Sequence, residues 1–352
     1  MTEKRVVVAS IGVALVLAAS PSMGRDPQWW GLGAVAVSPD GKTVMTGGQN
    51  RVLYVLDGQT LKVTRRIWFE TRLGWASYNK DGSVLVVEDE REYLHFLNAE
   101  TLKEISVLPD CYVHTHHRSA DLLATVKFDR KERKKPPYIR LLSLSDGSEK
   151  GRIELRKGAG SRYMTFTPDA KRLLVLASRK DAAEKTVKRS DIPKDIKGQA
   201  RLEFEQRHDG YTSELLTFEV PSGKLLKTAK TWYACRRGRL TLAIDGDDVL
   251  VFQETNINAR IGPDGKTTLF RTGLAGECRG VSENHKTAVV ASWRRVAHIA
   301  IDGMKETRIA PECGIIVGIT FGPDGSAWLA TSGYRLVRVS RDGKLKSTTP
   351  VY

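Results

Sequence analysis

The chain has little cysteine and only one long apolar run, and each shortage narrows the choice of protein class. Four cysteines in 352 residues are too few for a disulfide-stabilised scaffold, so any disulfides would only supplement a hydrophobic core. Hydrophobic residues make up 41% of the chain and charged residues 28%, which indicates a sizeable core and no disorder by composition. No second long apolar run follows the one at the N-terminus, so we expect no transmembrane segment in the mature chain.

The N-terminus has the layout of a secretory signal peptide. Lys4 and Arg5 precede the apolar run, and small residues follow it at 20–24. A basic stretch, an apolar stretch and a small-residue cleavage zone are the three parts of such a signal. We therefore expect residues 1–24 to be a signal peptide, with an uncleaved anchor as the alternative. Residues 25–352 would then form one domain, exported to the periplasm or the extracellular space.

The chain does contain a local pattern that recurs seven times. A short apolar strand runs into a tight turn and then into a second apolar strand. Such a repeat, with a period near forty residues and built from short strands, is typical of propeller blades. The equivalent turn positions are Asp40, Asp81, Asp121, Asp169, Asp245, Asn284 and Asp324.

A second hairpin follows each of these turns. Alternating stretches such as 52–62 and 336–344 contain Asp-Gly turns, which is typical of β-hairpins. Each repeat therefore holds four strands, and the sequence predicts an all-β, seven-bladed β-propeller of four-stranded antiparallel blades. Six blades is the alternative, because the repeat at about 235–272 is the least regular. The last blade has an outer strand of its own at 346–352, so we expect the ring to close by side-chain packing, with Trp29 and Trp30 covering the seam.

The Ser-Pro-Asp-Gly turn at 38–41 resembles the turns of bacterial WD40-like propellers of the TolB type. The resemblance covers nearly the whole mature chain, although the Gly-His and Trp-Asp dipeptides of eukaryotic WD40 repeats are absent. It implies a propeller fold and a broad role as an interaction platform. It transfers no functional residue, because one fold hosts many functions.

Catalytic motifs are missing from the chain. No Gly-x-Ser-x-Gly, His-Glu-x-x-His, phosphate-binding loop or haem-attachment motif occurs. The innermost strands hold few ionisable groups, and we expect no titratable pair to converge there as acid–base catalysis requires. His114 and His116 are the exception, because two imidazoles on one face of a strand could hold zinc or copper, with Cys111 or a neighbouring group completing the site. We expect no enzyme activity and no cofactor, and a lactonase-type hydrolase with a metal near His114 and His116 is the alternative.

Two repeats carry charged insertions, at about 127–137 and 179–213. Both follow the second strand of their blade, so both would emerge on the same face of the ring. Insertions on one face of a repeat protein often mark its binding face, and a tolerated surface loop is the alternative. The residues predicted to bind are basic: Lys131, Arg133, Lys134, Lys135, Lys185, Lys188 and Arg189.

The net charge of +15 would attract an anionic partner. For an exported protein this partner would be a protein or an acidic polymer of the cell envelope, and nucleic acid is a poorer fit. We therefore expect a monomeric interaction platform. A structural component of the cell envelope is a second alternative, and charge that serves only solubility is the simplest one. Among the cysteines we favour a Cys278–Cys313 disulfide, although Cys278 also neighbours Cys235 in blade order.

Overall fold

The structure is a computed structural model, and it describes the greater part of the chain after residue 30. The described residues are 31–127, 138–155, 160–180, 193, 195, 200, 201, 204, 211–232, 240–253, 257–274, 278–292, 295–309, 315–342 and 344–350. The predicted signal peptide, Trp29, Trp30 and the seven basic residues predicted to bind lie outside these ranges, so those expectations stay predictions.

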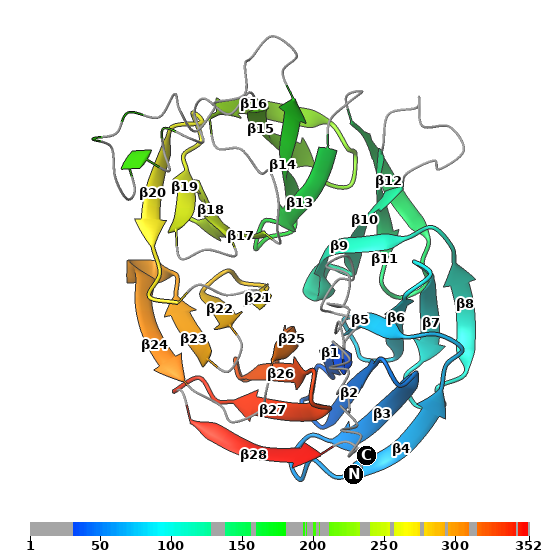
Figure 1. Cartoon of the computed structure of the whole chain (residues 1–352). Helices are drawn as coiled ribbons and strands as arrows, with labels where there is room; N and C mark the ends of the chain where they lie inside the picture. Colours follow the sequence, from blue (N-terminus) through cyan, green and yellow to red (C-terminus); the bar gives the residue numbers. More distant parts are fainter. Residues whose placement is uncertain are drawn as a thin grey trace, which may run out of the picture.

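Seven antiparallel sheets of four strands form a ring (Figure 1). This arrangement confirms the all-β, seven-bladed propeller and excludes the six-bladed alternative. Within every sheet the hydrogen-bonded order is the chain order, and the first strand lies innermost. The numbering of the blades below follows the chain.

The strand bounds show how regular the repeat is. The innermost strands are β1 (Leu32–Val37), β5 (Leu73–Tyr78), β9 (Tyr112–His117), β13 (Gly160–Phe166), β17 (Thr241–Asp245), β21 (Cys278–Val281) and β25 (Ile316–Phe321). The second strands are β2 (Thr43–Gly48), β6 (Val84–Asp89), β10 (Leu122–Lys127), β14 (Arg172–Lys180), β18 (Asp248–Phe252), β22 (Thr287–Ser292) and β26 (Ala327–Thr331). The third strands are β3 (Val52–Asp57), β7 (Leu94–Asn98), β11 (Tyr138–Ser143), β15 (Tyr211–Glu219), β19 (Ile257–Ile261), β23 (Arg295–Ala300) and β27 (Arg335–Val339). The outermost strands are β4 (Val63–Trp68), β8 (Glu104–Leu108), β12 (Glu149–Glu154), β16 (Leu225–Thr231), β20 (Thr267–Arg271), β24 (Lys305–Ile309) and β28 (Leu345–Pro350).

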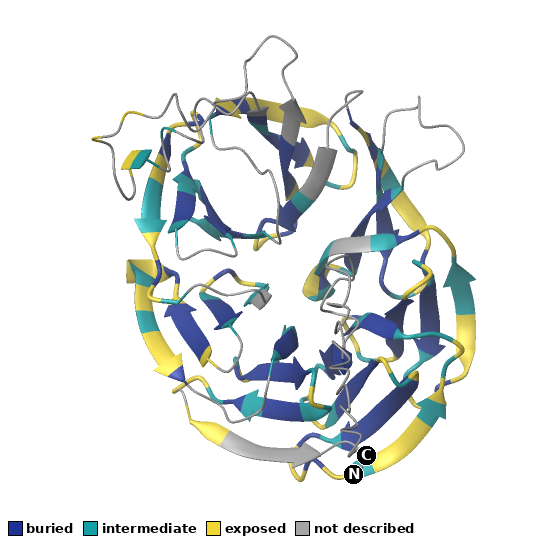
Figure 2. Cartoon of the chain, in the orientation of Figure 1, coloured by how far each residue is buried: buried dark blue, intermediate teal, exposed yellow. Residues whose placement is uncertain are grey.

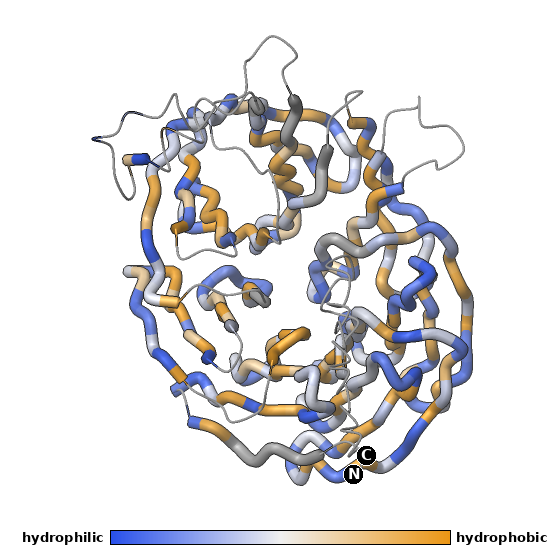
Figure 3. The backbone as a smooth tube through the Cα atoms, viewed as in Figure 1, coloured by the Kyte–Doolittle hydropathy of each residue, from blue (hydrophilic) through white to orange (hydrophobic). Residues whose placement is uncertain are grey.

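The hydrophobic core lies between neighbouring blades. Successive side chains of a strand point to opposite faces of its sheet, so each blade packs on the blade before it and the blade after it. In the first blade, Leu53 belongs to a cluster with Leu85 of the second blade, whereas Tyr54 belongs to a cluster with Trp328 of the seventh. Figure 2 shows buried inner strands and exposed outermost strands, and Figure 3 shows apolar segments recurring along every blade.

The ring closes where the seventh blade meets the first. The outermost strand of the seventh blade is β28, which pairs with β27, as the sequence predicted. Close packing of β25 against β1 joins the two blades, because a Cβ atom on Gly318 would lie only 2.4 Å from the carbonyl oxygen of Gly33. The seam therefore depends on the absence of a side chain at this position.

The two faces of the ring differ in which connections they carry. The first turn of each blade joins its innermost strand to its second strand, and these turns lie together on what we call the first-turn face. The connections from second to third strands lie on the opposite face. The predicted insertions are attached there, after Lys127 of β10 and Lys180 of β14, and β15 already begins at Tyr211.

Candidate functional site

The first turns of the seventh, first and second blades are built alike and pack on one another. Gly41 has a φ of +72°, and the ring of Pro323 lies 3.3 Å from where its Cβ atom would be. Gly82 has a φ of +80°, and the ring of Pro39 comes within 2.9 Å in the same way. In this sector a proline of one turn thus covers the glycine of the next turn.

The first turn of the fifth blade is shorter. Strand β17 ends at Asp245 and β18 begins at Asp248, so only Gly246 and Asp247 lie between them. Gly246 has a φ of +60°, and a Cβ atom there would meet no atom within 4 Å. This turn contains no proline, and the space beside it is open.

A cavity of about 880 Å³ occupies that space, and we call it the interblade pocket. Its floor is apolar, with Leu174, Leu215 and Ala229 from the fourth blade and Ile244 and Val249 from the fifth. This volume lies in the range of small-molecule and side-chain binding pockets, roughly 300–1,000 Å³. Charged residues from blades four, five and six also line it: Asp169, Arg172, Lys227, Asp245, Asp247, Lys286 and Asp302.

A second hollow of about 380 Å³ lies where the inner strands end, and we call it the channel mouth. The residues that line it come from blades one, two, three, four, six and seven, so it is central to the ring. Pro168 and Asn284 line both hollows. The channel mouth and the interblade pocket therefore adjoin on the first-turn face.

The third blade reaches across the channel mouth. In place of a Pro-Asp-Gly turn, its connection forms one short 3₁₀ turn, η2 (Arg118–Ala120), which begins after His117. His117 Nδ1 lies 2.9 Å from Glu283 Oε1 of the sixth blade, and His117 Nε2 donates to the Pro168 carbonyl of the fourth over 3.1 Å. The Ser119 N–H donates to the same Glu283 oxygen over 2.7 Å. We call His117, Ser119 and Glu283 the channel latch.

In the latch, hydrogen bonds favour the charged forms of both the histidine and the carboxylate. Burial disfavours both charges, but the hydrogen bond to Glu283 is strong enough to raise the pKa of His117. Burial likewise opposes ionisation of Glu283, yet the bonds from His117 and Ser119 lower its pKa to about 2. The expectation that no titratable pair converges in the channel is therefore wrong. The physical reason is that η2 extends over the channel, where a tight turn would have stopped at its rim.

A second histidine links three blades next to the latch. His285 lies in the first turn of the sixth blade with a φ of +54°. Its Nδ1 accepts from the Ile244 N–H over 3.0 Å, and its Nε2 donates to the Phe166 carbonyl over 2.9 Å. Burial lowers the pKa of His285 to about 4, so the ring is neutral and both of its nitrogens have partners.

These histidines join blades and are poorly suited to proton transfer. A general base needs a lone pair that faces the substrate, and both nitrogens of His117 and of His285 are engaged within the protein. His116 lines the channel mouth, packs edge-on against Trp75 with ring centroids 5.1 Å apart, and has its pKa lowered by burial to about 4. Both nitrogens of the two blade-linking histidines, His117 and His285, are thus occupied within the protein.

The predicted metal and disulfide sites are only partly described. Cys111 is a buried free thiol, and burial raises its pKa. The side chains of His114 and Cys278 lie outside the described residues, as does Cys313. Among the residues that are described, no three His, Cys, Asp or Glu side chains form a group that could hold a metal ion. The His114–His116 site and the Cys278–Cys313 disulfide stay predictions.

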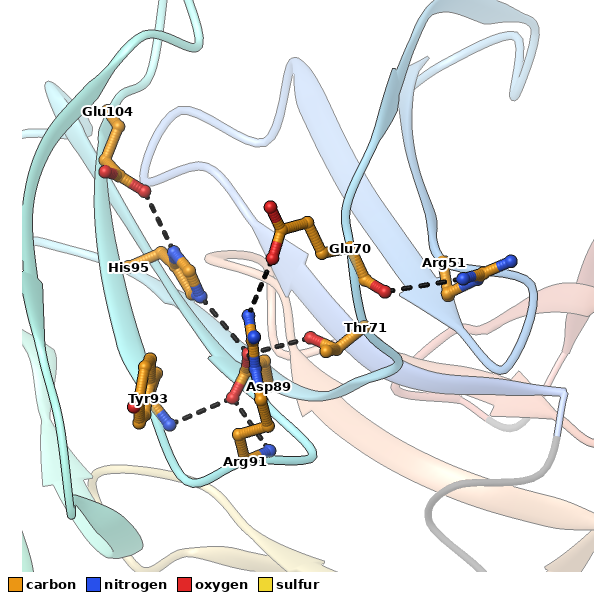
Figure 4. A network of polar contacts seen from close by, with 8 residues as sticks. All are labelled: Arg51, Glu70, Thr71, Asp89, Arg91, Tyr93, His95 and Glu104. Carbon is orange, nitrogen blue, oxygen red and sulfur yellow. Dashed lines mark hydrogen bonds and ion pairs between the residues drawn. The ribbon is translucent and has the colours of Figure 1, made fainter.

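A separate polar network lies on the opposite face, in the second blade (Figure 4). Asp89 is its buried centre, and it accepts from Thr71 Oγ1 over 2.7 Å and from the backbone N–H groups of Arg91 and Tyr93. His95 lies between Asp89 and Glu104, at 3.5 and 3.0 Å. Although burial opposes it, the pKa of Asp89 falls far below its usual range because of these donors. The network fixes the connection between β6 and β7.

The sequence pointed to some of these residues but not to Glu283, the carboxylate of the channel latch. His117 was visible beside His114 and His116, but nothing near it predicted its contact with Glu283. The available signal was the third turn itself, Ser119-Ala120-Asp121, which lacks the proline and glycine of the regular turns. Within the described part of the chain, no helix is long and apolar enough to cross a membrane. No protein-family model matches the sequence, and no curated protein matches it.

Proposed function

We propose that this protein is an exported, non-enzymatic interaction platform, similar to bacterial WD40-like propellers, that binds an anionic macromolecule. The partner would be a protein or an acidic polymer of the cell envelope. The observation that carries the proposal is the pair of adjoining hollows on the first-turn face. They offer an apolar floor and a polar centre, and their described histidines are engaged in joining blades.

The interblade pocket is the part of this face that can anchor an apolar group. Leu174, Leu215 and Ile244 would contact such a group inside, and Leu226 lies at the rim with 48% of its surface exposed. An apolar side chain buried there would be removed from water, which is the main source of binding free energy in most interfaces. The net charge of +15 favours encounter with an anionic partner and makes the encounter sensitive to salt.

The two hollows favour the first-turn face for docking, whereas the charged insertions are attached to the opposite face. The basic residues predicted to bind, Lys131 to Lys135 and Lys185 to Arg189, would then attract the partner at long range without forming its pocket. Their simultaneous replacement by serine would slow association at low salt and leave the dissociation rate nearly unchanged.

A matched pair of leucine variants tests the docking site. Leu226 is the second residue of β16 and Leu345 the first residue of β28; they are 48% and 46% exposed, and both lie at the first-turn end of an outermost strand. Only Leu226 lines the interblade pocket. Binding to acidic glycans, anionic vesicles and envelope proteins is measured for the mature chain by surface plasmon resonance. Leu226→Ser should weaken binding about tenfold, since a buried leucine contributes roughly 1.5–3 kcal/mol, while Leu345→Ser should bind like the wild type.

Three results would contradict the proposal. The wild type could bind none of these partners at low salt, the two leucine variants could bind equally well, or the purified protein could contain stoichiometric zinc or copper and hydrolyse lactones. The last result would instead support the metal-dependent hydrolase built on His114 and His116.

A further inference from the structure

We propose that Arg118 is an oxyanion-binding residue, and that a carboxylate or phosphate group enters the channel mouth and bonds to its guanidinium group. This inference deepens the platform function and rests on it for the identity of the partner. The binding of an oxyanion at Arg118 can be measured without that partner.

Arg118 holds its charge over the centre of the ring with most of its hydrogen-bond donors available. The first residue of η2, it is half-buried and lines the channel mouth. Its Nη1 donates to the carbonyl of Val37 in the first blade over 3.1 Å. A guanidinium group carries five N–H donors, and among the described residues no carboxylate forms an ion pair with Arg118. The bond to Val37 positions the side chain and leaves an edge for a ligand.

Other partly buried arginines of the same face are paired. Arg260 contacts Asp245 at 2.7 Å and Asp248 at 2.9 Å, and Arg338 contacts Asp324. A half-buried guanidinium group without a carboxylate is costly unless something else offsets its charge. Among the described residues, Arg118 has no carboxylate partner, whereas Arg260 and Arg338 do. A bound oxyanion would supply that partner.

The acidic residue of the channel mouth is engaged by the latch, and among the described residues it forms no ion pair with Arg118. Glu283 is the single acidic residue among those that line the described channel mouth, and its Oε1 already accepts from His117 and Ser119. When His117 is protonated, the histidine and Glu283 neutralise each other, and Arg118 is left as the net charge of the mouth. His116 and His285 are the other titratable groups that face the latch, and burial keeps both neutral.

The shape and lining of the mouth fit one oxyanion group on a polypeptide or polymer. Its volume of about 380 Å³ admits a group of side-chain size, and Ser77 and Thr320 are among the residues that line it. Arginine pairs with carboxylate and phosphate groups through two parallel hydrogen bonds, which lysine cannot form. Arginine residues at the centre of an interface also contribute disproportionately to binding.

Binding of small oxyanions to the mature protein tests the inference. Citrate, inorganic phosphate and sodium chloride are titrated separately at constant ionic strength, and binding is followed by calorimetry and by NMR shifts of the residues around the mouth. Arg118→Gln removes the charge and keeps a shorter, polar amide side chain. Lys80→Gln, in the exposed first turn of the second blade, is the control for a lost positive charge on the same face.

We expect the wild type and Lys80→Gln to bind an oxyanion with equal affinity, Arg118→Gln to bind at least tenfold more weakly, and Arg118→Lys to fall between them. Preference for citrate or for phosphate then decides between a carboxylate and a phosphate group. A thermal unfolding curve first shows that Arg118→Gln is folded. The inference is overturned if this folded variant binds the anions like the wild type, or if the wild type binds neither anion. If the oxyanion does not bind but Leu226→Ser still weakens partner binding, the platform function stands and the role of Arg118 fails. If the oxyanion binds but no partner is captured, the role of Arg118 stands and the platform function fails.

Discussion

The seventh, first and second blades are joined on the first-turn face by a repeated contact, whereas the third to sixth blades are joined by individual side chains. In the first sector, prolines of the seventh and first turns cover the glycines of the first and second turns, as Pro39 does for Gly82. In the second sector, His117 and His285 form hydrogen bonds to neighbouring blades, and the short turn at Gly246 leaves a cavity. The interblade pocket lies in the sector where the repeat is interrupted, whereas the channel mouth borders both sectors.

Truncation of a core leucine should give the largest difference in stability loss between the two sectors. Leu53 and Leu215 both lie in third strands, at 0% and 4% exposure, but only Leu215 borders the interblade pocket. Leu53→Ala should lower the free energy of unfolding by about 3–5 kcal/mol, because it leaves a new cavity in a close-packed cluster. Leu215→Ala should lower it by about 2 kcal/mol, since one side of Leu215 already faces open space. Urea unfolding measures both, and equal losses would show that the pocket is filled in solution.

The fold was predictable because the repeat is encoded locally. Tight turns place a residue at a positive φ, which glycine adopts most easily, as at Gly41, and such turns at intervals near forty residues are visible in the chain. The candidate site was not, because its contacts form only when the ring closes. Ser119 and Glu283 are 164 positions apart, and their pairing depends on the position of the sixth blade across the channel. Arg118 appeared in the sequence as one surface charge among 56 lysines and arginines, and only the structure places it at the centre.

Disruption of the polar network in the second blade should give the next largest loss of stability. Asp89 is fully buried and accepts from Thr71, Arg91 and Tyr93, so Asp89→Asn would place an amide donor against several donors. We expect a loss of about 2–3 kcal/mol, in line with hydrogen bonds to buried charged groups. Thermal unfolding of Asp89→Asn measures the loss, and Asp81→Asn in the exposed first turn of the same blade is the control. A variant as stable as the wild type would mean that the connection between β6 and β7 needs no anchor.

The channel latch should contribute less, and in a defined pH range. The pKa of Glu283 falls from 4.5 to about 2, so its contribution is present above pH 4.5 and is lost as pH falls toward 2. The pKa of His117 is raised from 6.5, so its contribution is present below pH 6.5 and is lost as pH rises through the raised value. Glu283→Gln should therefore destabilise the ring by about 1–2 kcal/mol, most strongly between pH 4.5 and 6.5.

Unfolding curves of the wild type and of Glu283→Gln across pH 2–9 measure this difference. NMR titration of His117 provides an independent readout, because its pKa should fall toward the ordinary value in the variant. A difference between the two proteins that does not change with pH would show that the latch acts through shape alone.

Replacing charged side chains at the surface should give the smallest difference in stability loss between the sectors. Arg260, beside the interblade pocket, contacts two carboxylates at 2.7 and 2.9 Å, whereas Lys42 in the first turn of the first blade lies 3.9 Å from Asp40 and is 79% exposed. Arg260→Gln should cost about 1 kcal/mol, because paired short contacts fix the turn that borders the pocket. Lys42→Gln should change stability by less than about 0.5 kcal/mol, as exposed single ion pairs do. The Arg260 loss should shrink in 1 M salt. If both variants lose the same stability, ion pairs do not help to hold the sector with the short turn, and its integrity rests on His117, His285 and the apolar floor alone.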